Sequence, residues 1–145
     1  MKDYVKFEWQ ELGIACRAKL LTEEAPGLCA AFLRLLPFES IQWHTVIAGE
    51  NMSIPTRLYW NKSEYPAQRK AGRLFFFANG QRIVIPYGET NEPGKVNAFA
   101  EFVPEDLQAL RVIGKEIATR MLTGRVEPLR VQVSRYSADT QGESE

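Results

Sequence analysis

The chain has 145 residues, which suits one domain and is too short for two ordinary ones. Apolar residues make up 45% and charged residues 25% of it, which is an ordinary globular mixture. Lys and Arg number 18, and Asp and Glu also number 18, so the formal net charge is zero. This balance argues against a nucleic-acid binder that relies on bulk positive charge and against a polybasic membrane partner.

The first residues and the scarcity of metal-ligating side chains narrow the class further. No apolar signal core is present at the start, and the longest apolar run, 74–78, is far too short to cross a membrane, so we expect a cytoplasmic protein. Cys16 and Cys29 are the only cysteines and His44 is the only histidine, so we expect neither a disulfide framework nor a metal centre. Phosphate-loop and nucleophile-elbow motifs are missing from the sequence.

The first third of the chain predicts a β-hairpin followed by a helix. Apolar and polar residues alternate over 5–9 and again over 14–20, which is typical of two paired strands. Apolar residues then recur at helical spacing over 22–36, with Thr22 as the candidate N-cap. Pro37 is expected to end this helix.

The middle of the chain predicts short strands separated by turn-rich stretches. We expect strands at 41–47, 52–59, 74–78, 82–86 and 96–103. Asn79-Gly80 predicts a two-residue hairpin turn between the third and fourth of these strands. The polar stretch 61–72 and the stretch 87–95, which is rich in Gly, Pro, Asn and Glu, are expected to be loops.

The last third predicts a second helix and a final strand. Pro104 is placed to open the helix, apolar residues line one face, and Gly124 is a candidate C-cap. A strand is expected at 129–133, and the small, polar tail 137–145 is expected to be disordered. We therefore expect one domain over 1–136. Many short strands with two isolated helices favour a mainly β fold, a closed antiparallel barrel with helices over its ends, because closure removes exposed edges.

Several segments resemble the cyclophilin family. The stretch 5–37 is similar to the start of a cyclophilin, and 43–47 resembles the next cyclophilin strand. More closely, residues 5–133 resemble a bacterial family of small cyclophilin-like proteins of unassigned function. The resemblance is carried by EEAPGLCAAFLRLLP, His44 with Gly49-Glu50, Tyr65-Pro66, Pro86-Tyr87-Gly88 and Asn97-Ala98-Phe99-Ala100. It implies a cyclophilin-like β-barrel capped by α-helices.

The chain departs from prolyl isomerases of this fold at one position that carries their chemistry. Those enzymes have an arginine after the strand histidine, and it polarises the prolyl amide nitrogen to ease rotation about the peptide bond. Here that position is Thr45, whose neutral hydroxyl cannot supply the charge. Arg57 could replace the missing arginine only if its side chain reached into the groove from a neighbouring strand. We therefore do not expect a typical prolyl isomerase, although residual isomerisation remains a hypothesis.

The same scaffold resembles that of Pictet–Spengler enzymes such as cucumopine synthase. That resemblance implies condensation and cyclisation of an aromatic amino acid or amine with an aldehyde or 2-oxo acid, without metal or cofactor. Such a reaction needs a base, proton donors and an aromatic-lined slot. The alternative is a non-catalytic module that binds a ligand or peptide. If the aromatic residues Phe38, Tyr59 and Trp60 are exposed, they could form the interface of a homodimer.

Three residues are the candidate catalytic groups. Glu50 follows a glycine at a strand end, where neighbouring aromatic rings would raise the pKa of its carboxyl and suit it to act as the base. His44 is a candidate proton shuttle, and Tyr87 a candidate donor to an oxyanion or imine. The alternatives are a solvated turn carboxylate, a half-buried histidine with satisfied hydrogen bonds and a tyrosine that anchors a turn.

Five further residues are candidate substrate contacts: Arg57, Trp60, Glu89, Asn97 and Phe99. Arginine can hold a carboxylate or phosphate in a forked pair, and an asparagine side chain can fix a carboxylate or amide. A solvated strand position is the alternative for Arg57. The three tryptophans, Trp9, Trp43 and Trp60, are expected in the core more than on a substrate platform.

Overall fold

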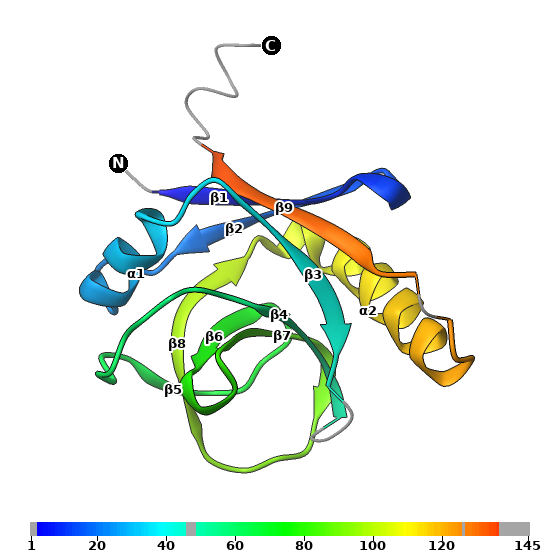
Figure 1. The fold of residues 1–145 in the computed structure, drawn as a ribbon. Coiled ribbons are helices and arrows are strands. Elements are labelled where there is room, and N and C mark those ends of the chain that lie inside the picture. The colour runs from blue at the N-terminus through cyan, green and yellow to red at the C-terminus, as the bar shows by residue number, and fades with distance from the viewer. Residues whose placement is uncertain (1–2, 46–48, 126, 137–145) are drawn as a thin grey trace.

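Eight antiparallel strands close into a barrel in the computed structural model, which describes residues 3–45, 49–125 and 127–136 (Figure 1). The described residues form nine strands in all: β1 (Tyr4–Trp9), β2 (Ile14–Leu20), β3 (Phe38–His44), β4 (Gly49–Pro55), β5 (Pro66–Gln68), β6 (Arg73–Phe77), β7 (Arg82–Thr90), β8 (Lys95–Phe102) and β9 (Leu129–Tyr136). Their order around the barrel is β2-β1-β9-β3-β4-β7-β6-β8, and β8 pairs back to β2. The short strand β5 pairs with β8 and lies outside this ring.

The predicted hairpin at the start of the chain is confirmed. β1 and β2 pair antiparallel with Phe7 opposite Cys16, and the apolar residues of β1 face the core in strict alternation. β1 also pairs with β9, so that Tyr4 lies opposite Tyr136. The pairing of Ala18 with Phe102 joins β2 to β8 and closes the barrel.

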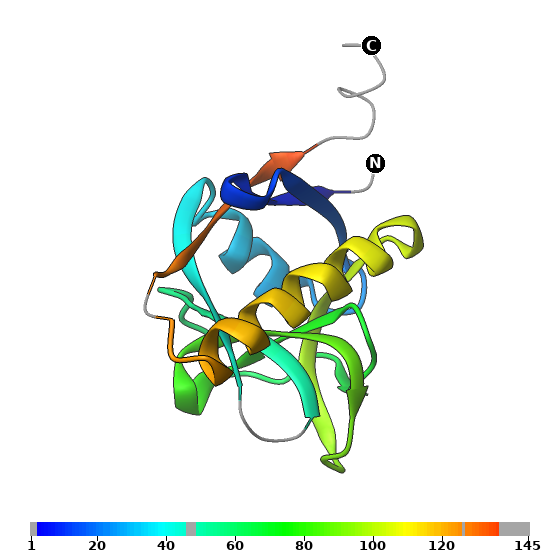
Figure 2. The same cartoon turned by 90° about the vertical axis from the view of Figure 1, so that its right-hand side faces the viewer.

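Two helices, α1 (Pro26–Leu33) and α2 (Leu107–Leu122), lie on opposite sides of the barrel (Figures 1 and 2). α2 buries the stripe Leu110, Ile113 and Ile117, and Gly124 follows it with a φ of 75°, in the left-handed region expected after a helix end. Within the described residues, neither helix combines the length and apolarity that crossing a bilayer would require.

The start of α1 differs from the prediction. Thr22 is not its N-cap, because the helix begins at Pro26. The free backbone N–H groups of Gly27 and Leu28 donate instead to the carboxylate of Glu64, over 3.1 and 2.9 Å. A carboxylate from a distant segment therefore satisfies the donors that a local N-cap would have taken.

Strand pairing overrides local composition at three other places. The turn between β6 and β7 is a 3₁₀ turn (η2, Ala78–Gly80) followed by Gln81 at a φ of 54°, so the expected two-residue turn is wrong although the hairpin forms. β7 continues to Thr90 because its end pairs with Gly49, so only part of 87–95 is a loop. β5 lies inside the stretch expected to be a loop, 61–72.

The remaining differences are smaller shifts of element ends. β4 covers Gly49–Pro55, earlier than the expected 52–59, and β9 continues beyond 133 to Tyr136. The end of the expected strand 41–47 lies outside the described residues, as does the tail 137–145.

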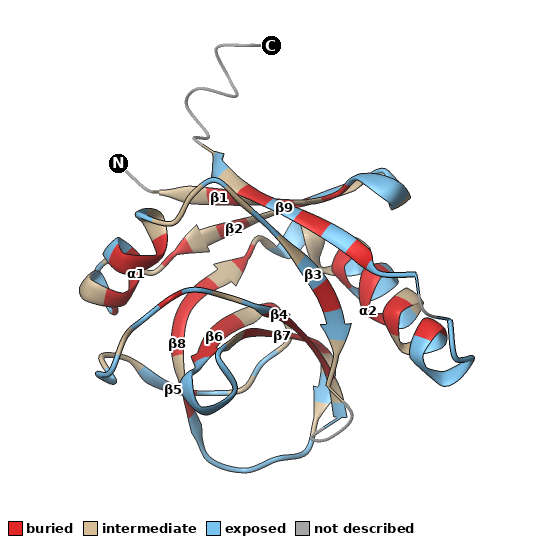
Figure 3. Ribbon diagram, in the orientation of Figure 1, coloured by how far each residue is buried: buried red, intermediate tan, exposed pale blue. Residues whose placement is uncertain are grey.

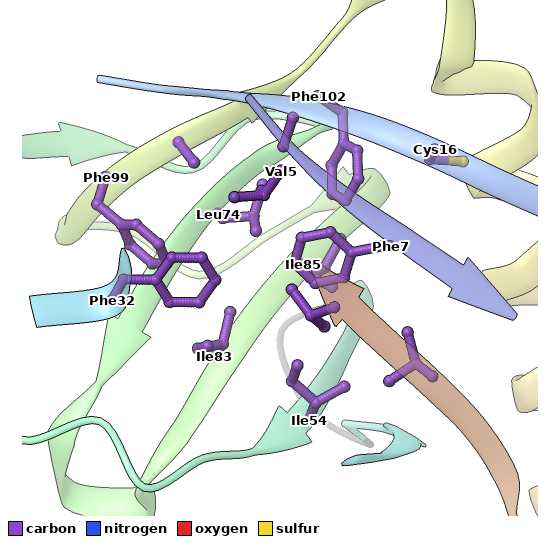
Figure 4. Packing of buried hydrophobic residues seen from close by; sticks show 14 of the residues in the cluster. Val5, Phe7, Cys16, Phe32, Ile54, Leu74, Ile83, Ile85, Phe99 and Phe102 are labelled. Carbon is purple, nitrogen blue, oxygen red and sulfur yellow. The ribbon is translucent and has the colours of Figure 1, made fainter. Parts of the chain in front are cut away.

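Buried residues lie on the strands and on both helices (Figure 3), and most of their apolar side chains form one core cluster. In the close view of Figure 4, Phe32 of α1 lies against Phe99 of β8, with ring centroids 5.1 Å apart. Phe7 and Phe102 form a second pair at 5.2 Å. The barrel is therefore a packed core rather than a channel, and a ligand must bind at its ends or outer surface.

Candidate functional site

His44, the last residue of β3, and Tyr87 of β7 form a hydrogen-bonded pair, with β4 between their two strands. The Nε2 atom of His44 lies 2.6 Å from the hydroxyl oxygen of Tyr87, and the Nδ1 atom lies 2.5 Å from the carbonyl oxygen of Thr45. Because a carbonyl oxygen only accepts, Nδ1 carries the hydrogen and donates it. Nε2 then accepts from the hydroxyl of Tyr87, so a neutral tyrosine donates to a neutral histidine.

The ring of Tyr87 is held by α2. A β-carbon on Gly114 would lie 2.4 Å from ring atoms of Tyr87, so only glycine leaves room for the ring against the helix. Tyr87 is 4% exposed. Glycine inside a helix costs about 1 kcal/mol relative to alanine, and at this position it allows the tyrosine to pack against α2.

Burial keeps both members of the pair uncharged. It lowers the pKa of His44 and raises the pKa of Tyr87, and in each case burial is the largest cause. The charge of Glu50 raises the pKa of both groups, whereas Lys115 lowers that of His44 and Arg111 lowers that of Tyr87. The pair therefore lies within electrostatic reach of a cluster of ionised side chains.

Glu50 is the centre of this ionic cluster. Its carboxylate accepts from the backbone N–H of Glu89 at 2.9 Å, from Nη1 of Arg111 at 3.2 Å and from Nζ of Lys115 at 2.5 Å. The hydrogen bond from Lys115 is the largest cause that lowers the pKa of Glu50 to about 2, followed by the Glu89 N–H. The expected raised pKa is therefore wrong, because cations and a backbone donor surround the carboxylate instead of aromatic rings.

Gly88 provides the space for this arrangement. A β-carbon at Gly88 would lie 1.9 Å from Oε1 of Glu50 and 2.8 Å from Nη1 of Arg111. An open hollow of about 650 Å³ lies beside the cluster and is lined by Gly49, Glu50, Glu89, Thr90, Asn91 and Arg111. Glu50 and Glu89, both candidates from the sequence, thus line one hollow together with a cation of α2.

Arg111 and Lys115 are site residues that the sequence prediction missed. Both lie on α2 and are exposed, with side chains 44% and 53% accessible. Their i, i+4 spacing places them on one helix face. The spacing was visible in the sequence, but it is equally typical of a solvated helix surface.

Arg57 and Phe99 lie elsewhere. Arg57 lines a separate groove of about 580 Å³ beside the segment that follows α1, in which Arg34 is a second cation. Phe99 is fully buried and packs against Phe32, so it belongs to the core and does not line a surface site.

Trp60 lies against the start of α1, and Asn97 of β8 bonds to the segment that follows Trp60. The Trp60 ring covers Gly27, where a β-carbon would lie 2.2 Å from it, and Nζ of Lys62 lies 5.9 Å from the ring centroid. Nδ2 of Asn97 donates to the carbonyl oxygen of Lys62 at 2.9 Å. These two candidates therefore do not line the hollow beside Glu50.

The other tryptophans divide between core and surface. Trp9 is fully buried, as expected, whereas Trp43 is 44% exposed, so its expected place in the core is wrong.

The hydroxyl of Thr45 donates to the carbonyl oxygen of Asn51 at 3.0 Å. In the described ranges, no three His, Cys, Asp or Glu side chains gather as metal ligands would.

Comparisons with known proteins place the fold. No family model and no curated protein sequence matches the chain. The structure of McbB in complex with tryptophan matches over 90% of this chain and 44% of that one, with a TM-score of 0.77 and 26% identity. The chain thus spans less than half the length of McbB.

Two other solved structures match over nearly their whole length. A hypothetical protein from Archaeoglobus fulgidus has a TM-score of 0.62 and 16% identity, over 93% of this chain and 95% of that one. The Mimivirus cyclophilin has a TM-score of 0.57 and 15% identity, over 97% and 91%. The predicted fold class is therefore confirmed: this is a mainly β chain with a cyclophilin-like closed barrel.

Proposed function

We propose that this protein is a cofactor-independent enzyme that joins an aromatic amino acid or amine to an aldehyde or 2-oxo acid in a Pictet–Spengler-type condensation. The observation that carries the proposal is the similarity to McbB, whose structure was determined with tryptophan, at 26% identity over 90% of this chain. That similarity supports an aromatic amino acid as one reactant. It agrees with the sequence resemblance to cyclophilin-like Pictet–Spengler enzymes.

The reaction sets the tasks of the site. The amine nitrogen attacks the carbonyl carbon, and water leaves to give a protonated imine. A carbon of the aromatic ring then bonds to the imine carbon, and the imine π electrons move to nitrogen. The same ring carbon finally loses its proton and restores aromaticity. The protein must therefore orient two reactants and accept one proton from carbon.

We assign the proton transfer to the His44–Tyr87 pair. The tyrosine oxygen accepts the ring proton as its own hydroxyl proton moves to Nε2 of His44, 2.6 Å away. The charge of Glu50 favours the imidazolium that results. Glu50 itself is a weak base, because its pKa is about 2 and a catalytic base works best with a pKa near the working pH. We therefore give Glu50 an electrostatic role.

The test is product formation by native and variant protein. The purified chain is incubated with tryptophan and a panel of aldehydes and 2-oxo acids, and mass spectrometry seeks the summed mass of the reactants less one water. Tyr87→Phe, which keeps the ring against α2, should slow the reaction by roughly 10²–10⁴-fold. Tyr59→Phe is the matched control, since Tyr59 is 80% exposed. The proposal fails if no product forms across the panel, and the assigned role fails if Tyr87→Phe retains full activity.

The second candidate is a binding module without catalysis. It is favoured by the engagement of Glu50 with two cations and by a neutral threonine at position 45. It requires that ligands raise the melting temperature while no product forms. A proline-peptide assay should give the rate of buffer alone, and a faster rate would restore the prolyl isomerase hypothesis.

A further inference from the structure

Two cations on α2 reach the same carboxylate from successive turns of the helix. Arg111 bonds one oxygen of Glu50 and Lys115 bonds the other. We infer that Arg111 and Lys115 also form the receptor for the carboxylate of the amino-acid substrate. This inference rests on the proposed function, because it names the residues that would bind that substrate at the same site.

Both cations have hydrogen-bond donors to spare. A guanidinium carries five N–H groups and an ammonium three. In the described part of the chain, Arg111 and Lys115 each donate through one nitrogen, and both donate to Glu50. With 44% and 53% of their side chains exposed, the remaining donors face solvent. Arginine is also suited to forked recognition of a carboxylate.

The surroundings fit an amino acid that carries an apolar side chain. On one side of Arg111 is the hollow of about 650 Å³ that contains Glu50 and Glu89. The side chain of Glu89 is exposed, and its negative charge suits an ammonium group. On the other side, Arg111 and Lys115 border a groove of about 460 Å³ whose lining includes Leu12, Ile14 and Val112. The protein groups that would bind the carboxylate, the ammonium and the apolar side chain of such a substrate thus lie within one region.

The test compares ligands that differ by one charged group. Binding of tryptophan and of tryptamine, which lacks the carboxylate, is measured by calorimetry on the full chain, and pyruvate is compared with acetaldehyde in the same way. Tryptophan should bind at least about tenfold more tightly than tryptamine, as expected for a charge-assisted hydrogen bond. The double variant Arg111→Gln, Lys115→Gln should lose this preference, and Arg111→Lys with Lys115 intact should keep part of it.

Arg125→Gln is the matched control. Arg125 is 48% exposed and pairs with Glu127 at 2.9 Å, so it resembles Arg111 in exposure and pairing but does not contact Glu50. It should keep the preference for tryptophan, and circular dichroism should show each variant folded. A preference of pyruvate over acetaldehyde that depends on the same two cations would assign the receptor to the 2-oxo acid instead of the amino acid.

The inference and the proposed function fail in different ways. Equal binding of tryptophan and tryptamine, a preference that survives in the double variant, or no binding of any carboxylate overturns the inference. Cation-dependent carboxylate binding without any condensation product supports the receptor and overturns the proposed reaction. Condensation that proceeds equally well with tryptamine and in the double variant supports the reaction and overturns the receptor.

Discussion

The ring of Tyr87 lies directly against the backbone of Gly114, so the tyrosine of β7 and the glycine of α2 fit together as one packing unit. Because the same tyrosine donates its hydroxyl to His44, this contact connects the position of α2 to the geometry of the pair. A change at Gly114 should therefore affect both stability and activity, although Gly114 bears no functional group.

Gly114→Ala tests this connection. Alanine favours a helix over glycine by about 1 kcal/mol, but its β-carbon would lie 2.4 Å from the Tyr87 ring. We expect net destabilisation of about 1–3 kcal/mol, as in other overpacked sites, measured by urea unfolding. The exposed Thr119→Ala on the same helix should change stability by less than about 0.5 kcal/mol. A Gly114→Ala protein as stable as the native one would show that the ring is free to move away.

His44 should titrate below its ordinary pKa of 6.5, because burial opposes its charge. As the only histidine in the chain, it gives a single imidazole signal that can be followed by NMR from pH 8 downwards. A measured pKa at or above 6.5 would contradict the half-buried, neutral state of His44.

The same shift predicts how stability depends on pH. The unfolded chain takes up the His44 proton near pH 6.5, whereas the folded chain takes it up only at lower pH. The free energy of unfolding should therefore fall as the pH drops from about 6.5 towards the folded pKa. Urea unfolding of the native protein and of His44→Gln at several pH values isolates the contribution of His44 to this loss of stability. The native protein should lose more stability than the variant as the pH falls, and a parallel loss in both would contradict the prediction.

Removing charges around His44 should shift its pKa in opposite directions. The charge of Glu50 raises the pKa of His44 and that of Lys115 lowers it, so Glu50→Gln should lower the value and Lys115→Met should raise it. The NMR titration of His44 measures both variants, and the exposed Glu92→Gln serves as a control without effect. Shifts of the same sign in both variants would mean that rearrangement, not charge, dominates.

Glu64→Ala should destabilise the fold through the start of α1. It removes the acceptor of the Gly27 and Leu28 N–H groups, and loss of a helix cap costs about 1 kcal/mol. The exposed Glu23→Ala provides the matched control in thermal unfolding. Equal stability of the two variants would indicate that water replaces the carboxylate at no cost.

The two cysteines should be unreactive in the folded protein. Burial is the largest cause that raises the pKa of Cys16 and of Cys29 to about 12, and both are free thiols. A thiol reagent at neutral pH should label neither until denaturant is added, since the thiolate is the nucleophile. Rapid labelling of native protein would show that the core opens locally.

Most of the architecture could be predicted because the hydrophobic pattern determines it. The alternation in β1 and β2 and the stripe of α2 each specify which face is buried. β5 was missed because it has only three residues and pairs with β8 in a stretch that is polar and aperiodic in sequence. The extra length of β7 was missed because its pairing with Gly49 depends on a residue far away in the sequence.

The site was predictable only in part, for a related reason. His44, Glu50 and Tyr87 lie at connected positions of β3, β4 and β7, which pair side by side. Arg57, Trp60 and Asn97 also lie on or near strands, but a strand position does not tell which end of a barrel a side chain will occupy. Arg111 and Lys115 come from a helix whose placement against the barrel depends on tertiary packing.

The antiparallel pairing of β1 with β9 places Tyr4 opposite Tyr136, so the start of β1 lies beside the end of β9 (Figure 1). A short linker between these strands would therefore connect first and last elements without strain on the barrel. New ends could then be opened in the exposed turn 91–94, between β7 and β8. Residues 4–136 are thus suited to circular permutation, which would open new ends next to the hollow and make that site available for attaching a reporter group.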